Sequence, residues 1–275
     1  MLVLQTPSES DLVPYSACTV LPAQAALVLA PHPDDEVFGC AGAIARHVSA
    51  GVSVSVVVLT DGALYGDASV RQHECREAAR VLGYGAPEFW NYPDRALAYG
   101  DALVQRLVEK IAHTGADLVY APSPWEVHPD HRQTHMLAVE AVRRSASNVR
   151  LALYEVAAPL RPNVLLDITA LVETKKAAMC CFESQLKQQD YVAHMQALNR
   201  YRTYTLGHDV LSAEAYWLVS PQELEHTMQG SLLSLLSHGA MHQTALADAP
   251  AKPVPSVSTP SLCQRFNNWR VRVFS

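Results

Sequence analysis

The sequence predicts a three-layer α/β fold in which helices cover both faces of a mostly parallel β-sheet. Short apolar runs of strand length alternate with helical segments of about 10 to 15 residues over roughly the first 160 positions. One of these runs, "VSVSVVVLT", is continuous and β-branched, as expected of a strand that is buried on both faces. In folds of this class ligands bind at the carboxyl ends of the strands, so the active site is expected there.

The first two predicted strands flank a helix. "AALVLA" (25–30) is an apolar run of strand length, and small and apolar residues then recur at helical spacing from Glu36 to Ala50. Gly51 supplies a stop for this helix, and the β-branched run at 52–60 follows directly. The three segments therefore form a βαβ unit, whose crossover is expected to be right-handed.

The same alternation continues along the chain. Residues 69–82 form a helical pattern that Gly83 ends, and "PEFWNY" (87–92) is a short strand. A second helical pattern covers 99–113, and "ADLVYAP" (116–122) is the next strand. These segments extend the sheet by two more parallel strands.

The pattern becomes looser in the second half of the chain. "HPDHRQTHMLAVEAVRRS" starts in a loop and becomes a helix, and "RLALYEVA" (150–157) is a strand. The later expected elements are a strand at 163–169, helices at 170–188 and 189–202, a strand at 213–220 and a helix at 221–238. We therefore expect one domain over 1–245, followed by a Pro/Ser/Ala-rich linker and a short tail over 246–275.

The composition argues against several classes of protein. The chain has 275 residues and a net charge of -6, without the basic block that nucleic-acid binding requires. Its six cysteines include no CxxC pair, so reduced thiols are expected rather than a disulfide framework. The sequence shows no signal peptide and no apolar run near the ~20 residues of a transmembrane helix. These features predict a soluble cytoplasmic protein.

An acidic motif follows the first predicted strand. "APHPDDEVFGCAG" (30–42) places Asp34, Asp35 and Glu36 side by side, where their like charges repel unless a cation or a helix N-terminus is present. One interpretation is structural, since acids at this point are common helix caps and first-turn residues. At the start of the helix Glu36 gains about 0.3–1 kcal/mol from the helix dipole.

A second motif follows the strand at 116–122. "SPWEVHPDH" (123–131) carries His128 and His131, and it falls on the same predicted rim of the sheet as the acidic motif. Two imidazoles and one carboxylate are a typical catalytic zinc set with one position left for water. The candidate ligands are His32, Asp35 and His131.

The remaining polar residues of the two motifs suit catalysis next to such a metal. Asp34 is placed to take a proton from the attacking water, which is worth roughly 10²–10⁴ in rate. His128 is a candidate for protonating the leaving group or for stabilising an oxyanion. Asp130 lies between the two histidines and is a candidate for orienting one of the rings.

Together the two motifs resemble those of the PIG-L/LmbE-like zinc-dependent deacetylases. That family removes the acetyl group from N-acetylglucosamine moieties on a Rossmann-like fold, and the resemblance covers about residues 25 to 220. Similar pieces are "LTDG" (59–62), "RQHE" (71–74), "YPD" (92–94), "DIT" followed by a lysine and "FESQ" within 167–185, and "AEAY" (213–216).

The resemblance implies a role for each motif residue. It implies zinc on His32, Asp35 and His131. It further implies that Asp34 is the general base, that His128 is the acid or oxyanion stabiliser, and that Asp130 tunes His128.

The resemblance also implies that Arg71 and Asp94 contact the sugar. Each residue has an ordinary structural alternative. Arg71 could form an exposed helix salt bridge with Glu74 or Glu77, since such pairs are common. Asp94 could be a turn residue after Pro93.

One residue departs from the family pattern. Glu126 stands where some members carry a tyrosine that helps to hold the oxyanion, a role that an anion cannot take. It would then face the substrate entrance or be a solvated loop acid. Aromatic residues near the predicted strand ends, namely Tyr65, Trp90, Tyr92 and Trp125, serve either sugar stacking or core packing. Cys40 is expected to be a small core residue.

Three functions stay open on the sequence, besides a catalytically inactive scaffold, against which the intact candidate ligand positions speak. The first is a zinc hydrolase that removes the N-acetyl group from an N-acetylglucosamine-type sugar or glycoconjugate, with iron(II) as another possible ion. The second is a related amidase for a larger acyl group or a thiol conjugate. The third is a non-catalytic nucleotide-binding module, against which stand the missing G-x-G-x-x-G and the acids that would repel a pyrophosphate. The expected partner is a small amino-sugar molecule.

Overall fold

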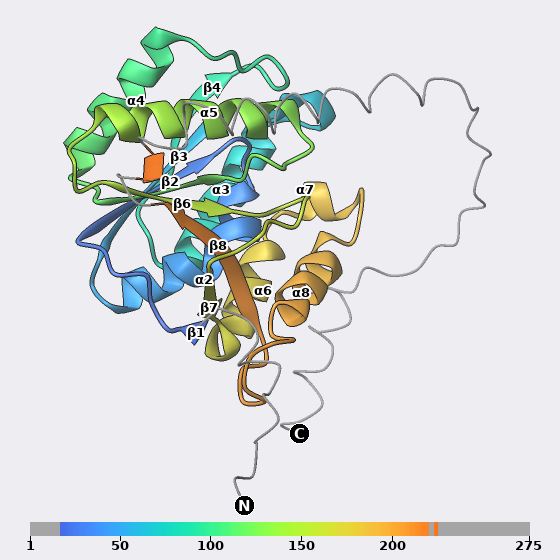
Figure 1. Ribbon diagram of the computed structural model, residues 1–275. Helices are drawn as coiled ribbons and strands as arrows, with labels where there is room; N and C mark the ends of the chain where they lie inside the picture. Colours follow the sequence, from blue (N-terminus) through green and yellow to red (C-terminus); the bar gives the residue numbers. More distant parts are fainter. Residues whose placement is uncertain (1–16, 220–222, 225–275) are drawn as a thin grey trace, which may run out of the picture. The chain divides into compact units, whose positions relative to one another are not determined.

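The computed structural model describes residues 17–219 and 223–224, which lie in one compact unit (Figure 1). The linker, the tail and most of the predicted helix at 221–238 lie outside the described residues, as does the expected domain boundary at 245. Within the described part of the chain, no helix is long and apolar enough to cross a membrane.

A single eight-stranded sheet forms the middle layer, in the order β1-β7-β8-β6-β5-β2-β3-β4. All neighbouring strands are parallel except β8, which runs antiparallel to both β6 and β7. The strands are β1 (Ala17–Cys18), β2 (Ala25–Ala30), β3 (Ser53–Thr60), β4 (Glu88–Tyr92), β5 (Leu118–Pro122), β6 (Arg150–Tyr154), β7 (Val164–Asp167) and β8 (Ala213–Val219). The prediction of a mostly parallel sheet is confirmed.

Helices cover both faces of this sheet (Figure 1). One face carries α2 (Asp35–Ser49), α3 (Ala68–Leu82) and α6 (Val172–Met179), with α8 (Tyr191–Tyr201) beside them. The other face carries α4 (Asp101–Thr114) and α5 (Pro129–Arg144). Shorter helical pieces are η1 (Ala63–Tyr65), η2 (Thr169–Leu171) and α7 (Glu183–Leu186).

The alternation of side chains along β2 explains why both faces are covered. Ala26, Val28 and Ala30 pack into the core beneath α2 and α3, while Leu27 and Leu29 pack into the core beneath α4 and α5. Successive side chains of a strand point to opposite faces, so a continuous apolar run needs a helical layer on each side.

The predicted helix at 170–188 is interrupted. It consists of η2 and α6, a break at 180–182, and then the single turn of α7. The chain leaves the helix because Phe182 turns inward, where it is fully buried and its ring lies 5.9 Å from that of Phe38. Burying this ring outweighs the helical propensity of the segment.

The strand order places the two motifs side by side. The chain proceeds from β2 to β3 and β4 on one side, then returns to place β5 and β6 on the other. The loops that follow β2 and β5 therefore leave the sheet at a topological switch point, where ligands bind in folds of this type. The N-termini of α2 and α5 meet there from opposite faces of the sheet.

Candidate functional site

The first loop holds Asp34 in a strained conformation. Its φ is 138° and its ψ is -29°, a region that residues with a side chain rarely adopt and that costs about 1–3 kcal/mol. Asp34 is the N-cap position of α2, yet its side chain makes no capping hydrogen bond. The interpretation of this acid as an ordinary helix cap is therefore wrong, because its carboxylate does not bind the N–H groups of α2.

Asp35, the first residue of α2, joins the two motifs. Its Oδ2 lies 3.1 Å from His32 Nδ1 and 3.1 Å from His131 Nε2. The same oxygen accepts a hydrogen bond of 2.9 Å from the backbone N–H of His32. The acid and the two histidines that the sequence singles out thus converge on one point, although they come from loops about 95 residues apart.

This convergence fits a metal site. Ligand atoms that surround zinc tetrahedrally at about 2.0–2.1 Å lie roughly 3.3 Å from one another, close to the separations seen around Asp35. Among the described residues, donor atoms of His32, His128 and His131 lie within 4.8 Å of one another, and so do those of His32, Asp94, His128 and Asp130. The donor set of imidazole nitrogens and carboxylate oxygens suits a divalent transition metal.

The charges of this cluster are strongly coupled. Burial alone would raise the pKa of Asp35, but the imidazoles of His131 and His32 outweigh it and hold that pKa well below its usual range. Burial would lower the pKa of His131, yet Asp35 and Glu126 raise it to about 9. Both shifts arise because Asp35 and the imidazoles share protons. A metal ion would displace these protons, since it binds the same nitrogen and oxygen atoms.

Arg71 is buried and fixes Asp34. Its guanidinium donates from Nη2 to Asp34 Oδ2 at 2.8 Å and to the carbonyl of Pro33 at 2.9 Å, and from Nη1 to the carbonyl of Gly62 at 2.8 Å. Burial raises the pKa of Asp34 more than Arg71 lowers it, to about 6. A carboxyl with this pKa can both exist as the anion near neutral pH and accept a proton.

The alternative of an exposed helix salt bridge for Arg71 is wrong. Glu74 accepts hydrogen bonds from the backbone N–H and the hydroxyl of Ser184, and Glu77 pairs with Arg80. Arg71 therefore lies at the site, and its expected contact with the sugar stays a prediction.

The "HPDH" motif forms the first turn of α5. His128 is the N-cap, with Pro129 at the first helical position, where its missing N–H costs nothing. His128 Nδ1 accepts a hydrogen bond of 3.2 Å from the backbone N–H of Asp130. Burial and the neighbouring charges of His32 and His131 lower the pKa of His128 to about 4, so the ring is neutral near pH 7.

Asp130 orients a different ring from the one expected. Its Oδ2 lies 3.1 Å from His32 Nε2 but 3.9 Å from His128 Nδ1. The backbone N–H groups of Arg95 and Leu97 also donate to the carboxylate, at 2.7 and 3.3 Å. The side chain of Asp130 thus lies closest to His32, and it acts on His128 through the backbone hydrogen bond and through its charge at 3.9 Å.

Asp94 faces the same cluster. Its Oδ1 lies 3.5 Å from His32 Nε2 and 3.9 Å from His128 Nε2, and it is buried without a hydrogen bond among the described residues. Its Oδ2 accepts a hydrogen bond of 3.3 Å from the backbone N–H of Leu64. Asp94 lies in the turn after Pro93, as the structural alternative expects, and its expected contact with the sugar stays a prediction.

Glu126 is the functional candidate whose placement the sequence did not reveal. It is 1% exposed, so neither a position at the substrate entrance nor a solvated loop acid describes it. Two of the aromatic candidates serve packing. Trp125 stacks on Trp217, with ring centroids 5.4 Å apart, and Trp90 lies in the core under α4. Cys40 is fully buried, as expected of a core residue.

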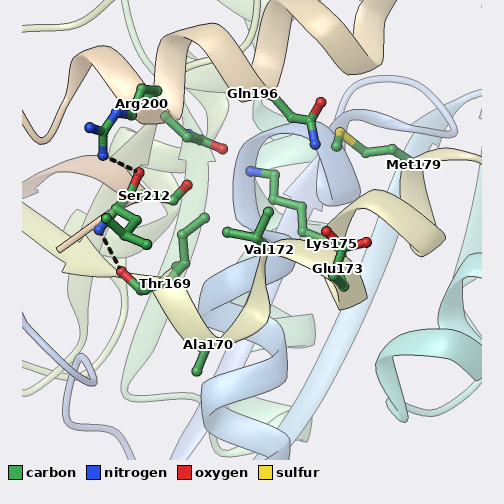
Figure 2. A pocket seen from close by; sticks show the side chains of 12 residues that line it. Thr169, Ala170, Val172, Glu173, Lys175, Met179, Gln196, Arg200 and Ser212 are labelled. Atoms are coloured by element: carbon green, nitrogen blue, oxygen red, sulfur yellow. Dashed lines mark hydrogen bonds between the residues drawn. The ribbon is translucent and has the colours of Figure 1, made fainter. Parts of the chain in front are cut away.

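A separate cavity of about 410 Å³ lies between α6 and α8 (Figure 2). Among its lining residues, Lys175 donates to the carbonyl of Phe38 and to Glu214, and Arg200 donates to the carbonyl of Leu211. None of its lining residues belongs to the carboxylate–histidine cluster. The cavity is thus distinct from the candidate site.

Comparison with known proteins gives relatives that are mainly deacetylases, with an amidase and a structurally similar hydratase among them. Residues 27–142 match the family model described as PIG-L, GlcNAc-PI de-N-acetylase. Diacetylchitobiose deacetylase of Thermococcus kodakarensis is 29% identical over 187 residues, which are 59% of this chain and 70% of that protein. Mycothiol S-conjugate amidase of Streptomyces coelicolor is 32% identical over 148 residues, which are 42% of this chain and 50% of that protein.

Solved structures agree with the sequence matches. N,N'-diacetylchitobiose deacetylase from Pyrococcus horikoshii superposes with a TM-score of 0.67 at 28% identity, covering 77% of this chain and 89% of that one. A conserved protein from Thermus thermophilus superposes with a TM-score of 0.64 at 31% identity, covering 70% of this chain and 94% of that one. Fold and motifs therefore point to the same group of proteins.

Proposed function

The chain belongs to the PIG-L family, and from this premise we propose that it is a zinc-dependent hydrolase of the N-acetyl group of an N-acetylglucosamine-type sugar or glycoconjugate. The observation that carries the proposal is the meeting of His32, Asp35 and His131, whose charges all act on the carboxylate of Asp34. The reaction breaks the amide C–N bond, adds the elements of water, and releases acetate and the free amine.

The proposed metal ligands are His32, Asp35 and His131. A divalent ion bound there supplies the Lewis acidity that polarises an amide carbonyl and lowers the pKa of water. Zinc is the ion that we propose for this donor set, which iron(II) can also satisfy.

Asp34 is the proposed general base. Arg71 holds Oδ2 of its carboxylate, and a pKa of about 6 allows the carboxylate to take a proton from the attacking water near neutral pH. The strained backbone at Asp34 turns the side chain away from capping α2 and toward this position.

His128 is the proposed acid or oxyanion stabiliser. Its Nδ1 is occupied as an acceptor from the Asp130 N–H, so the proton of the neutral ring lies on Nε2. Nε2 lies 3.9 Å from Asp94 Oδ1, so the two groups face the same part of the site. An N–H donor there can stabilise the developing oxyanion or deliver a proton to the leaving amine.

The decisive experiment is acetate release from a panel of N-acetylglucosamine compounds, including free sugar, chitobiose-type, lipid-linked and nucleotide-linked forms. The protein is assayed as purified, after chelation and after zinc is restored. We expect release that disappears with the chelator and returns with zinc. A protein that binds zinc but releases no acetate from any compound would contradict the proposed activity.

The general-base assignment is tested separately with Asp34→Asn. We expect turnover to fall by about 10²–10⁴-fold while the zinc content stays unchanged, because the amide retains the shape but not the basicity of the carboxylate. Asp101→Asn, an exposed position at the start of α4, is the matched control and should keep full activity. Retained turnover in Asp34→Asn would show that another group takes the proton.

A second candidate is an amidase for larger acyl groups, favoured by the similarity to a mycothiol S-conjugate amidase. It would use the same ligands and the same base. Rates for matched N-acetyl, N-butanoyl and N-cysteinyl glucosamine derivatives separate the two, since an acetyl-specific site loses activity as the acyl group grows.

A further inference from the structure

The carboxylate of Glu126 connects a backbone turn to an imidazole ring. The N–H groups of Val156, Ala157 and Ala158, in the turn that follows β6, donate to its two oxygens at 2.7, 3.1 and 3.5 Å. Its Oε2 also lies 3.3 Å from His131 Nδ1. These contacts fix the carboxylate in one orientation behind the ring.

His131 presents its other nitrogen to the candidate metal site. Nε2 is the atom that lies 3.1 Å from Asp35 Oδ2. A neutral imidazole that ligates through Nε2 carries its proton on Nδ1, and a buried N–H requires an acceptor. In the described part of the chain Nδ1 makes no well-aligned hydrogen bond, and Glu126 Oε2 is the carboxylate oxygen within ion-pair distance of it.

The other ligand histidine has the same kind of support. His32 faces Asp35 with Nδ1, while its Nε2 lies 3.1 Å from the carboxylate of Asp130. Each imidazole therefore has Asp35 on one side and a second buried carboxylate on the other. Asp130 and Glu126 are 0% and 1% exposed, so water does not compete for these contacts.

We propose that Glu126 is a positioning residue for metal binding: it holds His131 in the Nδ1–H tautomer and aims Nε2 at the ion. The inference rests on the proposed metal site, and it does not depend on which amide is cleaved. Glu126 occupies the position of the tyrosine that holds the oxyanion in some family members, and here it supports the proposed ligand His131 instead. His128 is then the donor that faces the substrate.

If Glu126 had a purely structural role, its removal would lower stability without a specific effect on metal affinity. A matched control distinguishes the two cases. Glu155 is also buried, at 3% exposure, and belongs to the same turn after β6. Its carboxylate pairs with Arg202 and accepts a hydrogen bond from the backbone N–H of Leu160. Among the described residues it has no contact with His32, Asp35 or His131. Removing either charge should cost stability, but only Glu126 should affect metal affinity.

The test compares Glu126→Gln with Glu155→Gln by zinc affinity, measured in competition with a chromogenic chelator, and by the absorption spectrum of the cobalt(II) form. We expect the zinc Kd of Glu126→Gln to rise about 10- to 100-fold and its cobalt spectrum to change, as is typical for loss of a carboxylate behind a ligand histidine. Glu155→Gln should match the wild type in both. A Kd for Glu126→Gln within twofold of the wild type would overturn the proposal.

A measurement on the wild type covers the case in which Glu126→Gln does not fold. Long-range ¹H–¹⁵N spectra of the zinc-loaded protein with labelled histidine report the tautomer of each ring. We expect His131 to carry its proton on Nδ1, in slow exchange with water. A proton on Nε2 would overturn the proposal. Neither experiment uses a substrate, so both outcomes are independent of acetate release.

Discussion

Asp34 shows how a single side chain acquires its role from its neighbours. Next to two acids at the start of a helix, it has the sequence signature of a cap. Its φ of 138° and the guanidinium of Arg71 instead hold the carboxylate where its charge interacts with those of Asp35, His32 and His131. The strain is maintained because Arg71 also binds two carbonyl oxygens of the surrounding loops, those of Pro33 and Gly62.

Arg71→Gln is therefore expected to lower kcat by about 10- to 100-fold, since a small displacement of a catalytic group costs rates of this order. Zinc content should not change. Steady-state acetate release distinguishes this from a direct sugar contact, which would raise KM and leave kcat unaltered. Arg76→Gln, an exposed arginine on the same helix whose guanidinium lies over Phe89, is the control and should behave as the wild type.

Glu36 differs from the simple expectation of a helix-dipole contact. It is fully buried in the first turn of α2, where it accepts from the backbone N–H of Asp34 and from Cys75 Sγ, each at 3.1 Å. Burial raises the pKa of this carboxyl to about 7. Its side chain thus supports the strained loop from inside the protein, in a position that periodicity alone does not reveal.

At the scale of elements, a buried ion pair between α6 and β8 holds α2 against the sheet. Glu214 on β8 accepts the backbone N–H groups of Gly42 and Ala43, at 2.8 and 3.0 Å, and the ammonium of Lys175 at 2.7 Å. Lys175 also donates to the carbonyl of Phe38. Gly42 permits this approach, because a Cβ there would lie 2.8 Å from the Glu214 carboxylate.

Lys175→Met is expected to lower the free energy of unfolding by about 3–5 kcal/mol, because it leaves a buried carboxylate without its cation. The double variant Lys175→Met/Glu214→Gln should lose less than the sum of the single variants. Urea denaturation measures these differences, with exposed Lys187→Met as the control. A loss below about 1 kcal/mol in Lys175→Met would mean that the pair contributes little to holding α2.

At the scale of the whole molecule, buried histidines make stability depend on pH. His47 on α2 is 1% exposed, and its Nε2 lies 2.8 Å from the hydroxyl of Tyr120 on β5. Burial lowers its pKa from 6.5 to about 4. Between these values the unfolded chain binds a proton that the folded protein does not, so stability falls as the pH decreases through this window.

We expect His47 to account for about 3 kcal/mol of this loss between pH 6.5 and pH 4, at roughly 1.4 kcal/mol per pKa unit. The unfolding free energy of His47→Phe should therefore decrease less between pH 6.5 and pH 4 than that of the wild type. This holds even if the variant is less stable at pH 7 because the Tyr120 hydroxyl has lost its partner. Burial also lowers the pKa of His135 to about 4, so part of the pH dependence of stability should remain in His47→Phe. Denaturation of the chelated protein at both pH values measures the effect, with exposed His73→Phe as the control. Parallel slopes in the wild type and His47→Phe would contradict the assignment.

The sequence by itself determined the alternation of strands and helices through β6, and it located both motifs at the carboxyl ends of strands. It could do so because side-chain periodicity and helix stop signals act locally, and because parallel strands share one rim. The candidate ligands could be named from residue types and positions alone, since two imidazoles and one carboxylate are a typical catalytic zinc set.

The tertiary structure decided the partners within that site. Arg71 forms an ion pair with Asp34 rather than with Glu74, and Asp130 contacts His32. Glu126 is buried next to Nδ1 of His131. The tertiary structure also set β8 antiparallel and ended the helix at 180–182. Each of these outcomes depends on side chains that meet across different elements, and local periodicity specifies which face of a segment is buried but not which distant group it meets.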